Sequence, residues 1–200
     1  MENMPHPVEA SITLPSWFDA DAADKVVHTA TEARMAYVIA LARRNVAEQT
    51  GGPFAAAVFA SDTGRLIAAG VNRVVASSMA IAHAEMVAFA MAGNAVGHHD
   101  IATVGRTELV ATTEPCAMCL GAVGWSGVTS LVCGARDEDA RAVGFDEGPK
   151  PDDWVADLIE LGISVTRDVM RAEASAILHE YAAAGGIIYN GRAALGERNA

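Results

Sequence analysis

Two short stretches carry side chains that could hold a metal ion. "AHAEM" contains His83 and Glu85, two residues apart among small and apolar residues, and "TTEPCAMCLGAVGW" contains Cys116 and Cys119 directly after Pro115. A helix opened by this proline places both sulfurs on one side of its first turn, and a helix N-terminus favours their thiolate forms. This spacing suits metal chelation, with thiol redox chemistry as the main alternative.

The pattern of apolar residues and turn residues predicts which elements position these side chains. We expect helices at residues 31–49, 80–93, 115–127, 151–162 and 171–185, and a short helix or turn at 137–145. Strands are expected at 54–60, 65–70, 107–113, 128–135 and 163–169, the first two forming a hairpin. Helices and strands alternate after the hairpin, which indicates a largely parallel sheet covered on both faces.

The histidine and the cysteines can meet if their helices begin at the same edge of this sheet. His83, Cys116 and Cys119 then make three protein ligands, and a tetrahedral Zn²⁺ keeps its fourth position for water, which is typical of a catalytic site. Two thiolates cancel the charge of the ion, so the ion acidifies its bound water less strongly. A nearby base that takes a proton from this water then contributes more to catalysis. Glu85 can serve as that base at the tip of its helix.

Composition and charge narrow the class of protein. The 200 residues, 52% hydrophobic and 20% charged, suit one globular domain over 1–200, with an N-terminal extension at 1–28 and a C-terminal tail at 186–200. The net charge of −11 argues against a large nucleic-acid footprint. The first residues do not resemble a secretory signal, and no apolar run in the sequence is long enough to span a membrane. Together with the presence of only three cysteines, this favours a cytoplasmic protein without a membrane partner.

The two metal-binding stretches together form the signature H-x-E…P-C-x-x-C. On these residues the chain resembles the zinc-dependent cytidine deaminase-like superfamily. The resemblance implies an α/β fold, a three-layer α/β/α sandwich with a central mixed, largely parallel five-stranded sheet. It also implies hydrolytic removal of an exocyclic amine, with Glu85 as general acid and base rather than as a zinc ligand.

Within the superfamily, the segment from Ala33 to Arg171 is most similar to the bacterial and plant guanine deaminase group. "GGPFAAAVFA", "GVNRVVASS" and "ARDEDARAVGFDEG" follow that group's landmarks in order. This similarity implies conversion of guanine to xanthine and ammonia by a homodimer, in which a C-terminal segment, sometimes swapped between subunits, acts as a lid. The implied substrate-binding residues are Phe54 and Trp125 as ring walls, Asn72, Ala84, Glu147 in preference to Asp146, and Tyr189 as the lid residue.

Other functions remain open at this point. Ala55 stands where the group usually has glycine, and Gly124 stands where a larger residue is common, so the substrate is not fixed. A tRNA adenosine deaminase shares "GVNR", "EPCAMC" and "GARD", although it needs a basic surface around its pocket. Cytosine, aminopterins and aminotriazines are further substrates to consider. A non-catalytic zinc or redox module is the alternative from another class.

Overall fold

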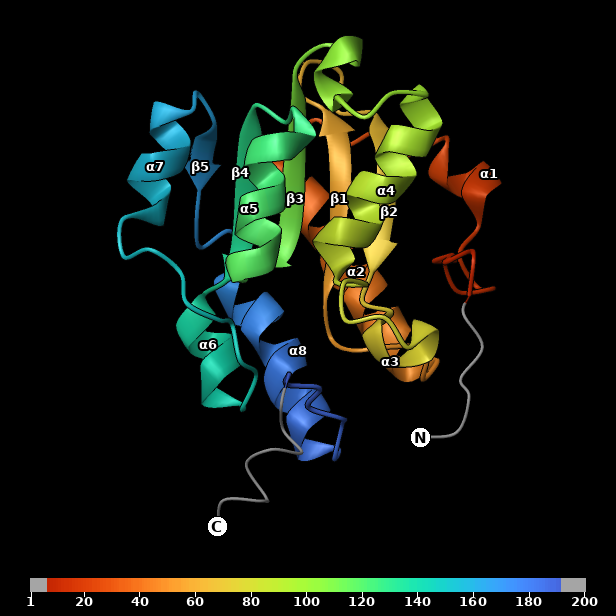
Figure 1. Ribbon diagram of the computed structural model, residues 1–200, viewed down its shortest axis with the longest axis vertical. Helices are drawn as coiled ribbons and strands as arrows, with labels where there is room; N and C mark the ends of the chain where they lie inside the picture. Colours follow the sequence, from red (N-terminus) through yellow and green to blue (C-terminus); the bar gives the residue numbers. More distant parts are fainter. Residues whose placement is uncertain (1–6, 192–200) are drawn as a thin grey trace.

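A computed structural model describes residues 7–191, which are built on one five-stranded sheet (Figure 1). Its strands are β1 (Ala55–Ala60), β2 (Leu66–Val71), β3 (Thr107–Thr113), β4 (Ser130–Ala135) and β5 (Ser164–Thr166), in the order β2-β1-β3-β4-β5. Strand β1 is antiparallel to β2 and β3, whereas β3, β4 and β5 run parallel. The sheet is therefore mixed, as the sequence predicts, and its parallel half carries the helix-connected strands.

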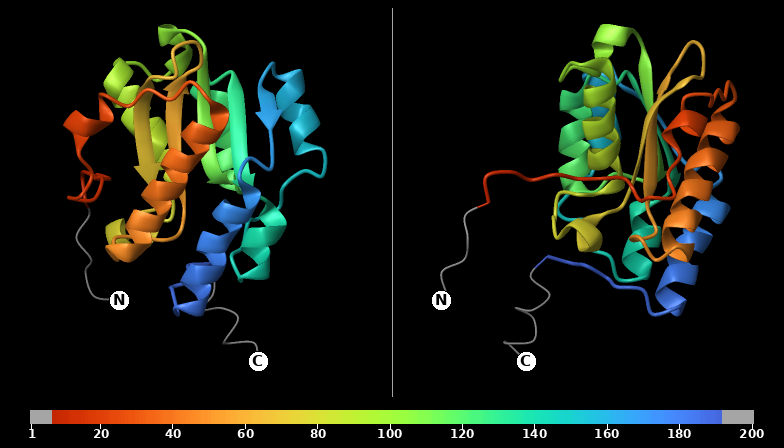
Figure 2. Two further views of the ribbon diagram at one scale, coloured as in Figure 1. Left: turned by 180° about the vertical axis from the view of Figure 1, so that it is seen from behind. Right: turned by 90° about the vertical axis from the view of Figure 1, so that its right-hand side faces the viewer.

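Helices cover both faces of this sheet (Figure 2). Helices α4 (Ala84–Val96), α5 (Ala117–Ser126) and α7 (Trp154–Glu160) lie on one face, and α2 (Thr31–Ala47) and α8 (Arg171–Ala183) lie on the other. The remaining elements are short: α1 (Ala20–Ala23), α3 (Val74–Ser77), α6 (Asp137–Ala142) and a 3-10 helix at Ile101–Val104. The described residues form the α/β/α sandwich that the resemblance implies.

Two separate cores follow from the alternation of side chains along the interior strand β1. Ala55, Ala57 and Phe59 of β1 belong to the cluster under α2 and α8, whereas Ala56 and Val58 belong to the cluster under α4 and α5. Successive side chains of a strand point to opposite faces, so a wholly apolar strand buries both. This explains why β1 reads as a continuous apolar run.

Gly70 in β2 sets how closely α4 lies on the sheet. A Cβ on this residue would lie 2.3 Å from the carbonyl oxygen of Ala84 and 2.4 Å from the nitrogen of Ala88. Only glycine leaves room for so close an approach of the helix backbone. The position of the first turn of α4, next to His83, depends on this contact.

The end of the N-terminal segment, at Val26–His28, pairs with the chain at the outer edge of the sheet, where β2 begins. The backbone N–H of Leu66 donates to the carbonyl of Val26 (3.0 Å), and that of His28 donates to the carbonyl of Gly64 (2.8 Å). Edge strands expose unpaired backbone groups, and this segment covers part of that edge. Residues 1–6 of the expected extension lie outside the described residues, and no helix within 7–191 is long and apolar enough to cross a bilayer.

Candidate active site

The helices that carry the metal-binding stretches begin at the same edge of the sheet. Because β2 and β3 are both antiparallel to β1, their carboxyl ends lie together. His83 is the N-cap of α4, and Cys116 is the N-cap of α5, which directly follows β3. After β2, residues 73–82 form a connection that contains α3. A hydrogen bond from Arg73 N–H to the Ala82 carbonyl (2.8 Å) closes this connection and returns the chain to the same edge.

The three predicted ligands come together there. The ligand atoms of His83, Cys116 and Cys119 all lie within 4.8 Å of one another, and His83 Nδ1 is 3.4 Å from Cys116 Sγ. A hydrogen bond with Cys119, assisted by His83, lowers the pKa of Cys116 and so favours the thiolate form of this sulfur. One imidazole and two sulfurs are a donor set that Zn²⁺ prefers. Among residues 7–191 no fourth side chain joins the group, so these residues fit a catalytic zinc site with one open position.

Glu85 lies in the first turn of α4 beside the ligands but outside the ligand group. Its side chain is buried, and this burial raises the pKa of the carboxyl group, with a further contribution from the Cys116 charge. A carboxyl group whose pKa is shifted toward neutrality can take up and release a proton during turnover. The geometry therefore allows the general acid and base role that the sequence predicts for Glu85.

A cavity opens beside these groups and is lined by most of the predicted substrate-binding residues. Phe54, Asn72, Ala84, Asp146, Glu147 and Tyr189 line it together with His83, Glu85 and Cys116. Three further lining residues were not predicted: Thr113, Glu114 and Phe145. The Phe145 ring packs against Phe54, with centroids 4.9 Å apart, and against Tyr189 at 5.3 Å, so the cavity has aromatic walls on two sides.

Glu147 and Asp146 are adjacent in sequence but differ in their surroundings. Glu147 is 7% exposed, and its burial, together with the nearby Cys116 charge, raises the pKa of its carboxyl group to about 8. The side chain of Asp146 is half exposed, and its Oδ1 accepts a hydrogen bond from the Gly148 backbone N–H (2.9 Å). Asp146 therefore stabilises the turn, which leaves Glu147 as the buried acceptor facing the cavity.

Asn72 presents its amide to the cavity with a defined orientation. Its Oδ1 accepts a hydrogen bond from the backbone N–H of Val74 (3.3 Å), so the N–H donors of the same amide are turned away from Val74. The fully buried Asn45 of α2 donates from Nδ2 to the carbonyls of Gly52 (2.9 Å) and Asn72 (3.0 Å). Asn45 therefore joins the two loops that border the cavity, a role that its isolated position in the helix did not reveal.

Tyr189 occupies part of the cavity in this structure. Its ring lies edge-on to His83 with centroids 6.4 Å apart, and its buried hydroxyl has no hydrogen-bond partner among the described residues. The space left beside it is small, so Tyr189 narrows the place where the ring of a substrate would lie. Residues 192–200 of the expected tail lie outside the described residues.

Comparison with known proteins identifies the family. The model of the cytidine and deoxycytidylate deaminase zinc-binding region matches residues 28–135. The chain belongs to this family of deaminases. A guanine deaminase from Nitrosomonas europaea has 47% sequence identity to this deaminase, with a TM-score of 0.83 over 90% of this chain and 100% of that one. Guanine deaminase from Bacillus subtilis is 35% identical over 54% of this chain and 67% of its own length. A tRNA-specific adenosine deaminase from Haemophilus influenzae is 34% identical over 61% of this chain and 68% of its own length.

Trp125 is not part of the cavity in the deaminase chain, contrary to the sequence-based prediction. It lies in the last turn of α5, is 88% exposed, and is not among the residues that line the cavity. Helix α5 begins at the sheet edge beside Cys116 and runs away from it, and nine residues of helix span about 13 Å. Phe145, in the loop after α6, provides the second aromatic wall instead.

Proposed function

We propose that this deaminase converts guanine to xanthine and ammonia. The observation that carries the proposal is the buried carboxyl group of Glu147, which lines the same cavity as Glu85 and two of the zinc ligands, His83 and Cys116. The pyrimidine edge of guanine is rich in N–H donors, and a carboxylate can accept two of them side by side. The similarity to two guanine deaminases supports the same substrate.

Each residue of the cavity has a distinct task in this reaction. His83, Cys116 and Cys119 would hold a Zn²⁺ ion, which would acidify a water molecule for attack on the carbon that carries the amine. Glu85 accepts a proton from this water, delivers it to the adjacent ring nitrogen and assists the departure of ammonia. Glu147 and Asn72 orient the base, Ala84 keeps the cavity floor narrow, and Phe54 with Phe145 excludes water from the ring faces.

Ammonia release across a panel of substrates tests this function. The panel includes guanine, cytosine, an aminopterin, an aminotriazine and a tRNA anticodon stem, each incubated with the zinc-loaded protein. We expect guanine to give the highest kcat/KM, and we expect no measurable release from the tRNA because the chain carries a net charge of −11. Faster release from the tRNA or from any other ring would contradict the proposal.

We also propose that the deaminase is a cytoplasmic homodimer. Large apolar side chains are exposed on α5 and on α7 with the residue after it, namely Met118, Trp125, Ile159 and Leu161, and Leu161 lies beside Gly124 of α5. Exposed apolar surface of this kind is typical of an interface, and in this proposal a second copy of the chain covers it. The zinc-binding thiols need a reducing compartment, and recovery of the protein in the cytosolic fraction of its own cells checks the location.

The tail of each subunit closes its own active site in this proposal, because Tyr189 lies in the cavity of its own chain. Sedimentation equilibrium should give twice the 20.7 kDa mass of one chain. A Tyr189→Ala protein and a Glu85→Gln protein should both be impaired, and mixing them should restore no activity, since no dimer then contains a complete site. Recovery of activity in the mixture would show that the tail closes the site of the partner subunit, and a monomeric mass would contradict the dimer.

A further inference from the structure

The segment that carries Glu147 is not held by the sheet. Residues 143–152 have no helix or strand between α6 and α7. We call residues 145–150 the Glu147 loop. The carbonyl of Glu147 accepts a hydrogen bond from the N–H of Ala117 (2.9 Å), which fixes one point of the loop next to the Cys116 ligand. A loop with so few backbone contacts needs side chains to fix the direction of its carboxyl group.

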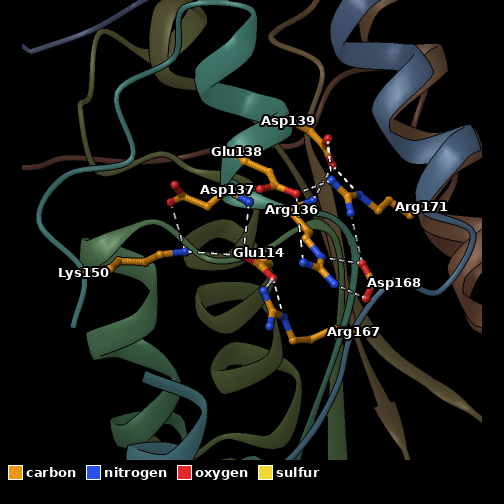
Figure 3. Close-up of polar contacts among 9 residues, drawn as sticks. All are labelled: Glu114, Arg136, Asp137, Glu138, Asp139, Lys150, Arg167, Asp168 and Arg171. Atoms are coloured by element: carbon orange, nitrogen blue, oxygen red, sulfur yellow. Dashed lines mark hydrogen bonds and ion pairs between the residues drawn. The ribbon is translucent and has the colours of Figure 1, made fainter. Parts of the chain in front are cut away.

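Asp137 supplies two such contacts from the first turn of α6. Its Oδ2 accepts a hydrogen bond from Arg141 Nε (2.5 Å), and Arg141 Nη2 donates in turn to the carbonyl of Gly148 (2.8 Å). Its Oδ1 lies 3.0 Å from Nζ of Lys150, whose side chain is almost fully buried (Figure 3). The carboxylate of Asp137 therefore holds both Arg141 and Lys150, the two cations that fix the part of the loop that follows Glu147.

Glu114 joins Asp137 to the metal ligands. It lies two residues before Cys116 and is buried. Its Oε2 accepts a hydrogen bond from the backbone N–H of Asp137 (3.1 Å), and its Oε1 accepts one from Arg167 Nε (2.6 Å), as Figure 3 shows. The start of α6 is thus tied to the turn that carries Cys116, so the contacts made by Asp137 relate the Glu147 loop to the zinc site.

We propose that Asp137 is a positioning residue for substrate binding: through Arg141 and Lys150 it holds the carboxyl group of Glu147 at a fixed place relative to the zinc ligands. The inference rests on the proposed function, in which Glu147 binds the base. Asp137 does not line the cavity, so its effect passes through the loop. Loss of its charge would leave Arg141 with only the more distant carboxylate of Asp146, at 3.9 Å, and would leave Lys150 buried, with Glu114 as the nearest acid at 3.8 Å.

The Asp137→Asn variant tests the inference because asparagine keeps the shape of the side chain and removes its charge. We expect KM for guanine to rise about tenfold and kcat to change less than about threefold, because a displaced binding group weakens substrate and transition state alike. Asp139→Asn is the matched control. Asp139 lies on the same helix and also accepts from an arginine (Arg171 Nε, 2.8 Å), but that arginine belongs to α8 and not to the Glu147 loop. We expect this control to keep the parent KM.

A double-mutant cycle separates positioning from a general loss of structure. If Asp137 acts through Glu147, Asp137→Asn should lower kcat/KM by less than about twofold in a Glu147→Gln background, since directly coupled residues are not additive. Losses that multiply, or an unchanged KM in Asp137→Asn, would overturn the inference while the parent protein still deaminates guanine. A parent protein that leaves guanine unchanged would overturn the proposed function, and the inference with it.

Discussion

We expect the Glu85→Gln protein to bind zinc as the parent protein does and to deaminate guanine at least about 100-fold more slowly. Glutamine has the shape of glutamate but cannot accept a proton. Glu85 lies outside the ligand group of His83, Cys116 and Cys119, so the metal donors are unchanged. The site would still bind guanine, and only the proton transfers between the attacking water, the ring and the leaving amine would fail.

Two measurements on the same preparation check this expectation. Metal analysis should give the parent amount of zinc per chain, and ammonia release should give kcat at saturating guanine. Glu160→Gln, which changes an exposed glutamate at the end of α7, serves as the control and should match the parent protein in both. A Glu85→Gln protein that contains zinc and turns over at the normal rate would remove the assigned role, and one that has lost zinc would make Glu85 part of the metal site.

The zinc site could be predicted from the sequence because its residues lie at helix starts. Local sequence signals, such as the proline before Cys116, indicate where a helix begins. When two strands run in the same direction, the helices that follow them begin at the same edge of the sheet. The spacing of the two cysteines then fixes the side on which their sulfurs lie. Local chemistry and fold topology were sufficient for this part of the site.

The substrate cavity was less predictable because tertiary packing determines it. Trp125 is nine residues after Cys116, the N-cap of α5, and the direction of the helix carries it away from the cavity. Phe145 follows α6 in a loop without periodicity, so no pattern indicated that its ring would face Phe54. Asn45 and Asp137 act through contacts with residues that are distant in sequence or in irregular loops, which a single sequence does not reveal.

The sequence favours Glu147 over the adjacent Asp146 as the acid that binds the base but does not fix the choice, and the two acids give a matched pair of variants. We expect Glu147→Gln to lower kcat/KM for guanine about 10- to 100-fold. Its amide replaces one acceptor oxygen with a donor, and this leaves buried N–H groups of the base unpaired, which costs about 1–3 kcal/mol. We expect Asp146→Asn to change kcat/KM less than about threefold, because its Oδ1 contact is to the backbone of Gly148 and an amide oxygen can accept the same bond.

The same pair of variants distinguishes substrate binding from stabilisation of the loop. Burial raises the pKa of Glu147 to about 8, so N–H donors of a bound base would stabilise the ionised form that burial disfavours. The Glu147→Gln side chain cannot ionise, so a bound base cannot stabilise a charged form of it. The loss should therefore appear in KM for guanine and in the affinity for a non-reactive purine, with the thermal midpoint unchanged. If Asp146→Asn caused the larger loss, the two acids would exchange roles, and the buried carboxyl group of Glu147 would no longer account for the choice of guanine.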